Sequence, residues 1–353
     1  MVLSNIITLG IPGQEQIRLR GYCMNYDKIT EVSLAPVRPE YEIIDSHLHF
    51  LDFTQASDGF PALAKAMDTA GVSRSVVFGM PLTKKWASYM NERPLYYMSD
   101  DSRCYYYSGT DHILAHELLS APEEIRNRFY PFCCGFDCTD KYAAVQIERL
   151  LKMYPKFWCG IGELMSRHDD LTALTYGEGI RVDNPAFCMI FDLAAEYGLP
   201  VLVHHNISPQ NAPYPLYQEE LVRALEHNRN CKIIWAHVGV SRRIEIEELL
   251  IIAGSMLSKN PNLYVDISWV FFENYVRGSL MTGSHDADSF TDMWAALIEK
   301  YPDRFMIGSD AVGHWSGYQK EIKKYYLLLD RLKPETVEKI CRRNILSLIK
   351  KWD

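Results

Sequence analysis

The stretch Ile43-Ile44-Asp45-Ser46-His47-Leu48-His49-Phe50 decides the fold, because it joins an apolar run to a His-x-His pair. The run is typical of a short buried strand. Alternate residues of a strand point to the same side, so His47 and His49 project together with Asp45 below them. Two neutral imidazoles in this arrangement are suitable ligands for a borderline metal such as zinc. The alternative is a pair of polar residues that merely cap a strand end.

Four further polar residues each follow another apolar, strand-like run. They are Glu163 after 157–162, His204 after 200–203, His237 after 232–236 and Asp310 after 305–309. From His47 onward the gaps of about 116, 41, 33 and 73 residues fit three, one, one and two strand-helix units of about 31 or more residues in an eightfold barrel. The polar residues would then lie at the ends of strands 1, 4, 5, 6 and 8. Catalytic groups of such barrels converge at the C-terminal ends of the strands.

Taken in order, five motifs resemble the amidohydrolase superfamily, and most closely its amidohydrolase-related (amidohydrolase 2) group of metal-dependent hydrolases and non-oxidative decarboxylases. The motifs are Asp45-Ser46-His47-Leu48-His49, Gly160-Ile161-Gly162-Glu163, Pro200-Val201-Leu202-Val203-His204, Ala236-His237-Val238-Gly239 and Gly308-Ser309-Asp310. The resemblance spans residues 41–350. It implies an α/β fold in which residues 41–353 form a metal-dependent (β/α)8 TIM barrel. Residues 1–40 would be a short N-terminal extension, either a β-hairpin over one barrel end or a disordered leader.

The resemblance also implies one or two divalent metal ions, with Zn²⁺ as the expected metal. Many dinuclear members of the superfamily carry a modified lysine on strand 4, whereas this chain has Glu163, as in the deoxyribonuclease-like branch, where the glutamate bridges two metals. With a single ion, His204 would complete its ligands and His237 would act as an electrophile or general acid. The implied ligands are His47, His49, Glu163, His204, His237 and Asp310.

His204 is followed directly by a second histidine. Neighbours on a strand face opposite sides, so only one of His204 and His205 can point into the barrel mouth. Both alternate sets of flanking residues are apolar, so the residues themselves leave the choice open. The family pattern implies His204.

These residues predict a metal-dependent hydrolase that cleaves an amide, lactone or other ester bond of a small molecule. Hydrolysis at a metal requires a bound water with a lowered pKa and a polarised substrate oxygen. Asp310 would be the general base, because a carboxylate is anionic and has several acceptor sites, and His237 is the second catalytic candidate. The alternative is a metal-dependent non-oxidative decarboxylase of a small carboxylic acid. The complete His/Asp set argues against a third reading, a non-catalytic barrel.

Composition excludes several other classes. The net charge is −8 and no Lys/Arg-rich run occurs, which argues against a nucleic-acid partner. No apolar run of about 18 residues is present and the first residues lack a signal-peptide pattern, so we expect no membrane attachment. The 9 cysteines are odd in number and include no Cys-x-x-Cys, which indicates neither a disulfide framework nor a thiolate zinc site. We therefore expect a reducing, cytoplasmic setting.

Some features lie outside the five motifs. The aromatic-rich stretch 81–107 is expected on the catalytic face, as a lid or wall of the pocket, or as a subunit interface of a homo-oligomer. A helix is predicted from Asp111, as N-cap, to Phe129. Further side chains are candidates for substrate contact, with a solvated loop as the alternative for Arg167 and His168 and a helix surface as the alternative for Arg242 and Arg243. They are Arg167, His168, Arg242, Arg243, Trp269 and His314.

Overall fold

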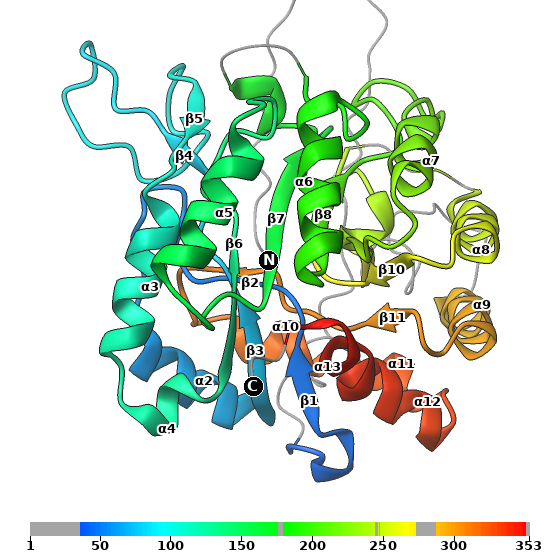
Figure 1. Cartoon of the computed structure of the whole chain (residues 1–353). Helices are drawn as coiled ribbons and strands as arrows, with labels where there is room; N and C mark the ends of the chain where they lie inside the picture. Colours follow the sequence, from blue (N-terminus) through cyan, green and yellow to red (C-terminus); the bar gives the residue numbers. More distant parts are fainter. Residues whose placement is uncertain (1–35, 176–178, 244–245, 247, 273–286, 351–353) are drawn as a thin grey trace, which may run out of the picture.

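The computed structural model describes residues 36–175, 179–243, 246, 248–272 and 287–350, so most of the predicted N-terminal extension lies outside the described residues. Its central sheet has eight parallel strands whose spatial order follows their order in the chain (Figure 1). The strands are β1 (Ile43–Asp45), β3 (Val72–Val77), β6 (Phe129–Cys133), β7 (Gly160–Ser166), β8 (Val201–His205), β9 (Ile233–Trp235), β10 (Leu263–Asp266) and β11 (Phe305–Met306).

The sheet closes on itself where the last strand meets the first. The backbone N–H of Ser46 donates to the carbonyl of Ile307 at 3.0 Å, and that of Asp310 donates to the carbonyl of His47 at 2.8 Å. Just beyond these bonds, β2 (Leu48–His49) pairs in parallel with β12 (Ala311–Val312). The predicted (β/α)8 barrel is thereby confirmed.

Helices surround the barrel (Figure 1). Asn184 caps α6 (Pro185–Tyr197) by accepting from the backbone N–H groups of Ala186 and Phe187, and the helix ends at Gly198 in the left-handed conformation. The α-helices are α2 (Phe60–Ala70), α3 (Thr110–Ser120), α4 (Glu123–Arg126), α5 (Ala143–Met153), α6 (Pro185–Tyr197), α7 (Gln218–His227), α8 (Leu249–Lys259), α9 (Ala287–Lys300), α10 (Tyr318–Lys323), α11 (Tyr326–Leu329), α12 (Pro334–Glu338) and α13 (Asn344–Leu348). The 3-10 helices are η1 (Pro39–Tyr41), η2 (Thr172–Leu174) and η3 (Ala236–Gly239), and η5 (Lys339–Arg343) is a π-helix.

The single helix predicted over 111–129 is wrong. Pro122 has no N–H to continue the helix, and the chain divides there into α3 and α4. Asp111 is not the N-cap but lies inside the first turn of α3. Its buried carboxylate accepts from the backbone N–H groups of Cys134 and Gly135, both at 2.9 Å, and so ties α3 to the end of β6.

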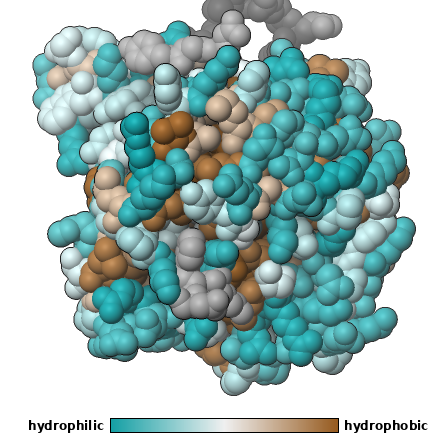
Figure 2. All heavy atoms as spheres, viewed as in Figure 1, coloured by the Kyte–Doolittle hydropathy of each residue, from teal (hydrophilic) through white to brown (hydrophobic). Residues whose placement is uncertain are grey.

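On the face shown in Figure 2, hydrophilic residues cover most of the surface. Brown, hydrophobic atoms appear over α3 and α5, two helices that carry the exposed side chains of Leu119 and Met153. Within the described ranges, no helix combines the length and the apolar character that a membrane crossing requires.

Asp45 holds the barrel closure together from below the His-x-His pair. Its fully buried carboxylate accepts from the backbone N–H groups of His47 at 3.1 Å and Ser309 at 2.9 Å. It also accepts from the hydroxyls of Ser309 at 2.7 Å and Tyr318 at 2.9 Å. Four donors from three parts of the chain therefore depend on one side chain.

Asp45→Ala should lower the free energy of unfolding by about 3 kcal/mol or more, because it leaves buried donors without an acceptor. Urea denaturation would measure the loss. Ser46→Ala is the matched control, since the Ser46 hydroxyl makes one buried bond, to the carbonyl of Ile307 at 2.8 Å, and its loss should cost about 1 kcal/mol. Equal effects of the two substitutions would show that Asp45 is not the closing contact.

Candidate metal centre

The six residues singled out from the sequence as metal ligands converge at the C-terminal ends of the barrel strands. All are buried except Asp310, whose side chain is 13% exposed. Three strands, one 3-10 helix and two connecting segments supply them, so the centre needs the closed barrel. His47 lies between β1 and β2, His49 in β2, Glu163 in β7, His204 in β8, His237 in η3 and Asp310 between β11 and β12.

Glu163 lies between two pairs of imidazoles. Its Oε2 is 3.1 Å from His49 Nε2 and 3.6 Å from His47 Nε2. Its other oxygen, Oε1, is 3.1 Å from His204 Nδ1 and 3.4 Å from His237 Nε2. One carboxylate thus faces four nitrogens with two different oxygens, which is the arrangement that a bridging ligand needs.

Asp310 lies on the side of the first histidine pair. Its Oδ1 is 3.2 Å from His47 Nε2 and 3.6 Å from His49 Nε2. Those two nitrogens, Asp310 Oδ1 and Glu163 Oε2 together make a set of four potential ligand atoms. Glu163 Oε1 with His204 and His237 makes a second, three-atom set.

These atoms fit a divalent ion. A tetrahedral ion with ligand bonds of about 2.0–2.1 Å holds its ligand atoms roughly 3.3 Å apart, close to the separations around Glu163. Imidazole nitrogens and carboxylate oxygens are the ligands that zinc takes in proteins. The buried Nε2 of His47 has no hydrogen-bond partner in the described part of the chain, which is the condition of a nitrogen kept for a metal.

The charges of the cluster support the same conclusion. Burial acts to raise the pKa of Glu163, but His47 and His204 lower it to well below its usual value. Burial likewise acts to lower the pKa of His47, yet Glu163 and Asp266 raise it well above its usual value. The carboxylates therefore require positive charge beside them, and a divalent cation supplies it.

The glycines of the motifs allow strands to approach the centre. A Cβ on Gly308 would lie 2.7 Å from the Cβ of His47, and one on Gly162, where φ is +125°, would lie 2.3 Å from the carbonyl oxygen of Leu202. His237 and Asp310 adopt positive φ values of 54° and 53°, which are uncommon for residues with a side chain and typical of strained functional positions.

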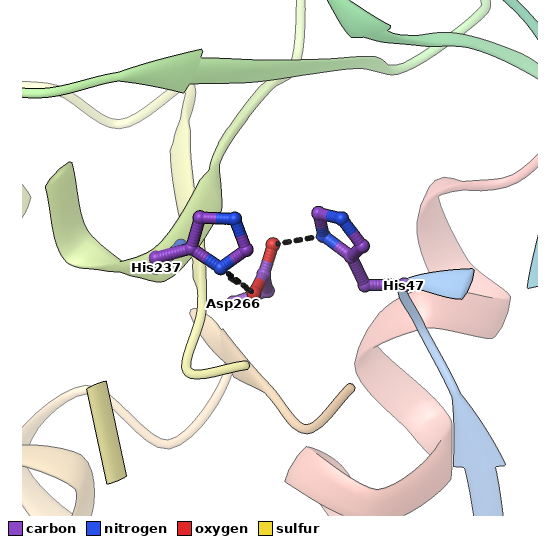
Figure 3. Close-up of side chains that lie close together, drawn as sticks. All are labelled: His47, His237 and Asp266. Carbon is purple, nitrogen blue, oxygen red and sulfur yellow. Dashed lines mark hydrogen bonds and ion pairs between the residues drawn. The ribbon is translucent and has the colours of Figure 1, made fainter. Parts of the chain in front are cut away.

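The sequence reasoning missed Asp266, which lies between His47 and His237 (Figure 3). Its Oδ2 accepts from His47 Nδ1 at 3.1 Å, and its Oδ1 is 3.7 Å from His237 Nδ1. With a divalent ion bound, the hydrogen on Nδ1 of His47 would leave the lone pair of Nε2 for the ion, on the side of Glu163 and Asp310. Asp266 follows the apolar run 263–265 as the last residue of β10, so a carboxylate at a strand end was the available signal.

The structure places His204, and not His205, in the centre. His205 lies away from it, with Nδ1 bonded to the Ser166 hydroxyl at 3.0 Å and Nε2 to the carbonyl of Tyr217 at 2.9 Å. His204 donates from Nε2 to Asn206 Oδ1 at 2.9 Å, which leaves its Nδ1 facing Glu163. The Asn206 amide in turn donates to Asp169 Oδ1 at 2.9 Å, which fixes its orientation.

A cavity of about 140 Å³ opens onto the centre, lined in part by Glu163, Asp310 and three of the four histidines. Of the candidate substrate contacts, His168, Arg242 and Trp269 line it. The stretch 81–107 forms the antiparallel hairpin of β4 (Leu82–Lys84) and β5 (Cys104–Tyr106), and Tyr96 and Tyr97 between them also line the cavity. This stretch therefore serves as a wall of the pocket.

Three candidate contacts do not line this cavity. Arg167 is bonded to Glu220, with Nη2 2.6 Å from Oε1. Arg243 is bonded to Asp170, with Nε 3.0 Å from Oδ1. The half-exposed His314 pairs with Asp58, with Nδ1 2.9 Å from Oδ1. Each of these side chains therefore pairs with a residue of the protein at the surface or in a loop, which was the alternative to a substrate contact.

A (β/α)8 barrel that gathers histidines and carboxylates at its strand ends defines a class of metal-dependent enzymes. A sequence model of the amidohydrolase family matches residues 121–350 of this chain. The chain therefore belongs to the amidohydrolase family (amidohydrolase 2), whose members are metal-dependent enzymes. A search of curated proteins found no match.

Solved structures share the fold at low sequence identity. An amidohydrolase from Burkholderia multivorans with bound zinc is 13% identical, with a TM-score of 0.56, over 87% of this chain and 98% of that one. A probable 2-pyrone-4,6-dicarboxylic acid hydrolase from Acinetobacter baumannii with bound citric acid is 12% identical, with a TM-score of 0.53, over 87% and 98%. A 2,6-dihydroxybenzoate decarboxylase from Rhizobium is 14% identical, with a TM-score of 0.50, over 87% and 98%.

Proposed function

We propose that this protein is a metal-dependent hydrolase that cleaves an amide, lactone or other ester bond of a small molecule. The observation that carries the proposal is the position of Glu163, whose two oxygens face two separate histidine pairs while Asp310 lies beside the first pair. A cavity of about 140 Å³ leads to these groups, which suits a small-molecule substrate.

In this proposal the six side chains hold two ions, and Asp310 also acts on the attacking water. His47, His49 and Asp310 would hold one divalent ion, and His204 and His237 a second, with Glu163 between the two. When bound, such an ion supplies Lewis acidity and lowers the pKa of water at the site. Asp310 would accept a proton from the attacking water, because its carboxylate lies both in the centre and at the cavity surface. If only one ion binds, His204 would complete its ligands, and His237, which also lines the cavity, would donate a proton to the leaving group.

A decarboxylase is the second candidate, and Arg242 favours it. Its guanidinium lines the cavity, lies 5.9 Å from the centre of the Tyr97 ring and pairs with Asp170. An arginine held in this way can bind the carboxylate of a small acid. A carboxylate-bearing ester or lactone would use the same contact, so the reaction itself must be assayed.

The zinc-loaded protein should hydrolyse members of a panel of small lactones, aryl esters and amides. The same sample should release no CO2 from a matched panel of aromatic carboxylic acids. Removal of the metal with a chelator should abolish hydrolysis, and zinc should restore it. Release of CO2 without hydrolysis would replace the proposal with the decarboxylase.

Asp266→Ala should weaken metal binding about 10- to 100-fold, because the His47 ring loses the acceptor that fixes its orientation. Competition with a chromophoric chelator would measure the change. Asp266→Asn keeps one oxygen acceptor and should therefore weaken metal binding less than Asp266→Ala. Metal affinity that is unchanged in Asp266→Ala would show that the ring is positioned by other contacts.

A further inference from the structure

His168 follows β7 and accepts hydrogen bonds from the backbone of its own loop. Its Nδ1 accepts from the N–H groups of Asp170 at 3.0 Å and Leu171 at 3.1 Å. The backbone N–H of His168 donates to the hydroxyl of Thr172 at 3.0 Å. The ring is therefore held at one edge by its loop.

These contacts fix the tautomer of the ring. A nitrogen that accepts two N–H groups carries no hydrogen of its own, so the hydrogen of the imidazole lies on Nε2. Among the residues placed by the structure, none is hydrogen-bonded to His168 Nε2. The loop thus leaves an N–H donor on the ring edge opposite to the one that it binds.

The ring lies at the substrate cavity. It packs against His204 with ring centroids 4.4 Å apart and planes tilted by 31°, and its centroid is 5.9 Å from that of Trp269. It lines the cavity together with Arg242. A donor with a fixed tautomer is therefore next to the candidate second metal position.

We infer that His168 is a substrate-binding residue that donates its Nε2–H to an oxygen of the substrate. The inference rests on the proposed function, in which this cavity holds the substrate. The oxygen is that of a carbonyl or a carboxylate, because an uncharged N–H donor serves both. Arg242 adds a positive charge to the same wall and selects the carboxylate.

Two substitutions separate this role from a structural one. In His168→Asn, the side-chain oxygen can take the place of Nδ1 and accept from the loop, but the Nε2 donor is lost. In His168→Gln, the amide nitrogen reaches the Nε2 position, while the acceptor for Asp170 and Leu171 is lost. The glutamine variant therefore keeps the donor to the substrate, and the asparagine variant keeps the acceptor for the loop.

Zinc-loaded protein labelled with ¹⁵N-histidine would be titrated with acetamide and with acetate, as neutral and charged oxygen probes, and followed by NMR. The spectrum should show His168 with hydrogen on Nε2, and that signal should move on addition of either probe. His168→Asn should bind acetamide about tenfold more weakly, the effect of losing one hydrogen bond, and His168→Gln should bind within about threefold of wild type. Arg242→Met should weaken the binding of acetate and leave the binding of acetamide unchanged.

The inference would be overturned if the spectrum showed the hydrogen on Nδ1 of His168. It would also be overturned if His168→Asn bound acetamide normally while His168→Gln lost acetamide binding. Intact hydrolysis with probe binding that does not depend on His168 would overturn it as well and leave the proposed function standing. Probe binding that depends on His168, in a protein that hydrolyses no ester or amide, would support this role and count against the proposed reaction.

Discussion

Asp310→Asn is expected to lower the turnover of a hydrolysed substrate by about 10²–10⁴, the usual contribution of a positioned general base. Asparagine keeps the shape of the side chain and its acceptor oxygen but has no basicity, so the fold should survive. Burial acts to raise the pKa of Asp310, whereas His47 lowers it to below its usual value, and so the carboxylate is ionised and able to accept a proton. Steady-state kinetics with metal content measured in the same sample would test the effect.

Asp58→Asn is the matched control, because Asp58 pairs with His314 and does not line the cavity. Its turnover should match that of the wild type. Near wild-type turnover in metal-loaded Asp310→Asn would show that Asp310 is not the base. His237 would then be the next candidate, and the hydrolase proposal would lose its main support.

The double substitution His47→Ala with His49→Ala should remove the metal from the first position. It deletes two of the four ligand atoms around that position and leaves Glu163 and Asp310, which compete poorly with water for the ion. Elemental analysis of the purified variant should show a loss of at least one ion per chain relative to the wild type.

A second histidine pair provides the control. His112 and His116 lie four residues apart on α3, a spacing that can bind metal, but both are exposed and far in the chain from the motifs. Their double replacement by alanine should leave metal content unchanged. If it removes metal and the change at His47 and His49 does not, the centre has been placed wrongly.

The barrel could be predicted from the sequence because its signals are local and repeated. Apolar runs of strand length recur at intervals that fit strand-helix units, and each of five runs ends near a histidine or carboxylate. The limits of α6 were also predictable from local signals, because Asn184 and Pro185 favour the start of a helix and Gly198 favours its end.

Other parts of the site depend on contacts between distant segments. Asp266 carries no motif of its own, and its role appears only when β10 is placed between His47 and His237. The residues alone left the choice between His204 and His205 open, and only the family pattern implied His204. The contacts of these histidines with Asn206 and Ser166 give the physical reason. Tertiary contacts of this kind leave no periodic pattern in the sequence.

The loop after β7 shows the same limit. His168 and Arg167 are adjacent and equally polar, and the sequence offers no reason to prefer one as a substrate contact. The structure separates them, because Glu220 binds the guanidinium of Arg167 while the backbone of Asp170 and Leu171 holds the ring of His168. The burial of Tyr97 in the wall of the cavity likewise follows from how the hairpin of β4 and β5 folds.

Anomalous diffraction at the zinc absorption edge, from crystals of the purified protein, tests the central claim most directly. We predict a zinc peak bounded by His47, His49, Glu163 and Asp310, and a second peak on the side of Glu163 that faces His204 and His237 when the site is fully loaded. Zinc-soaked crystals with no peak at this cluster, or with peaks only elsewhere on the protein, would contradict it.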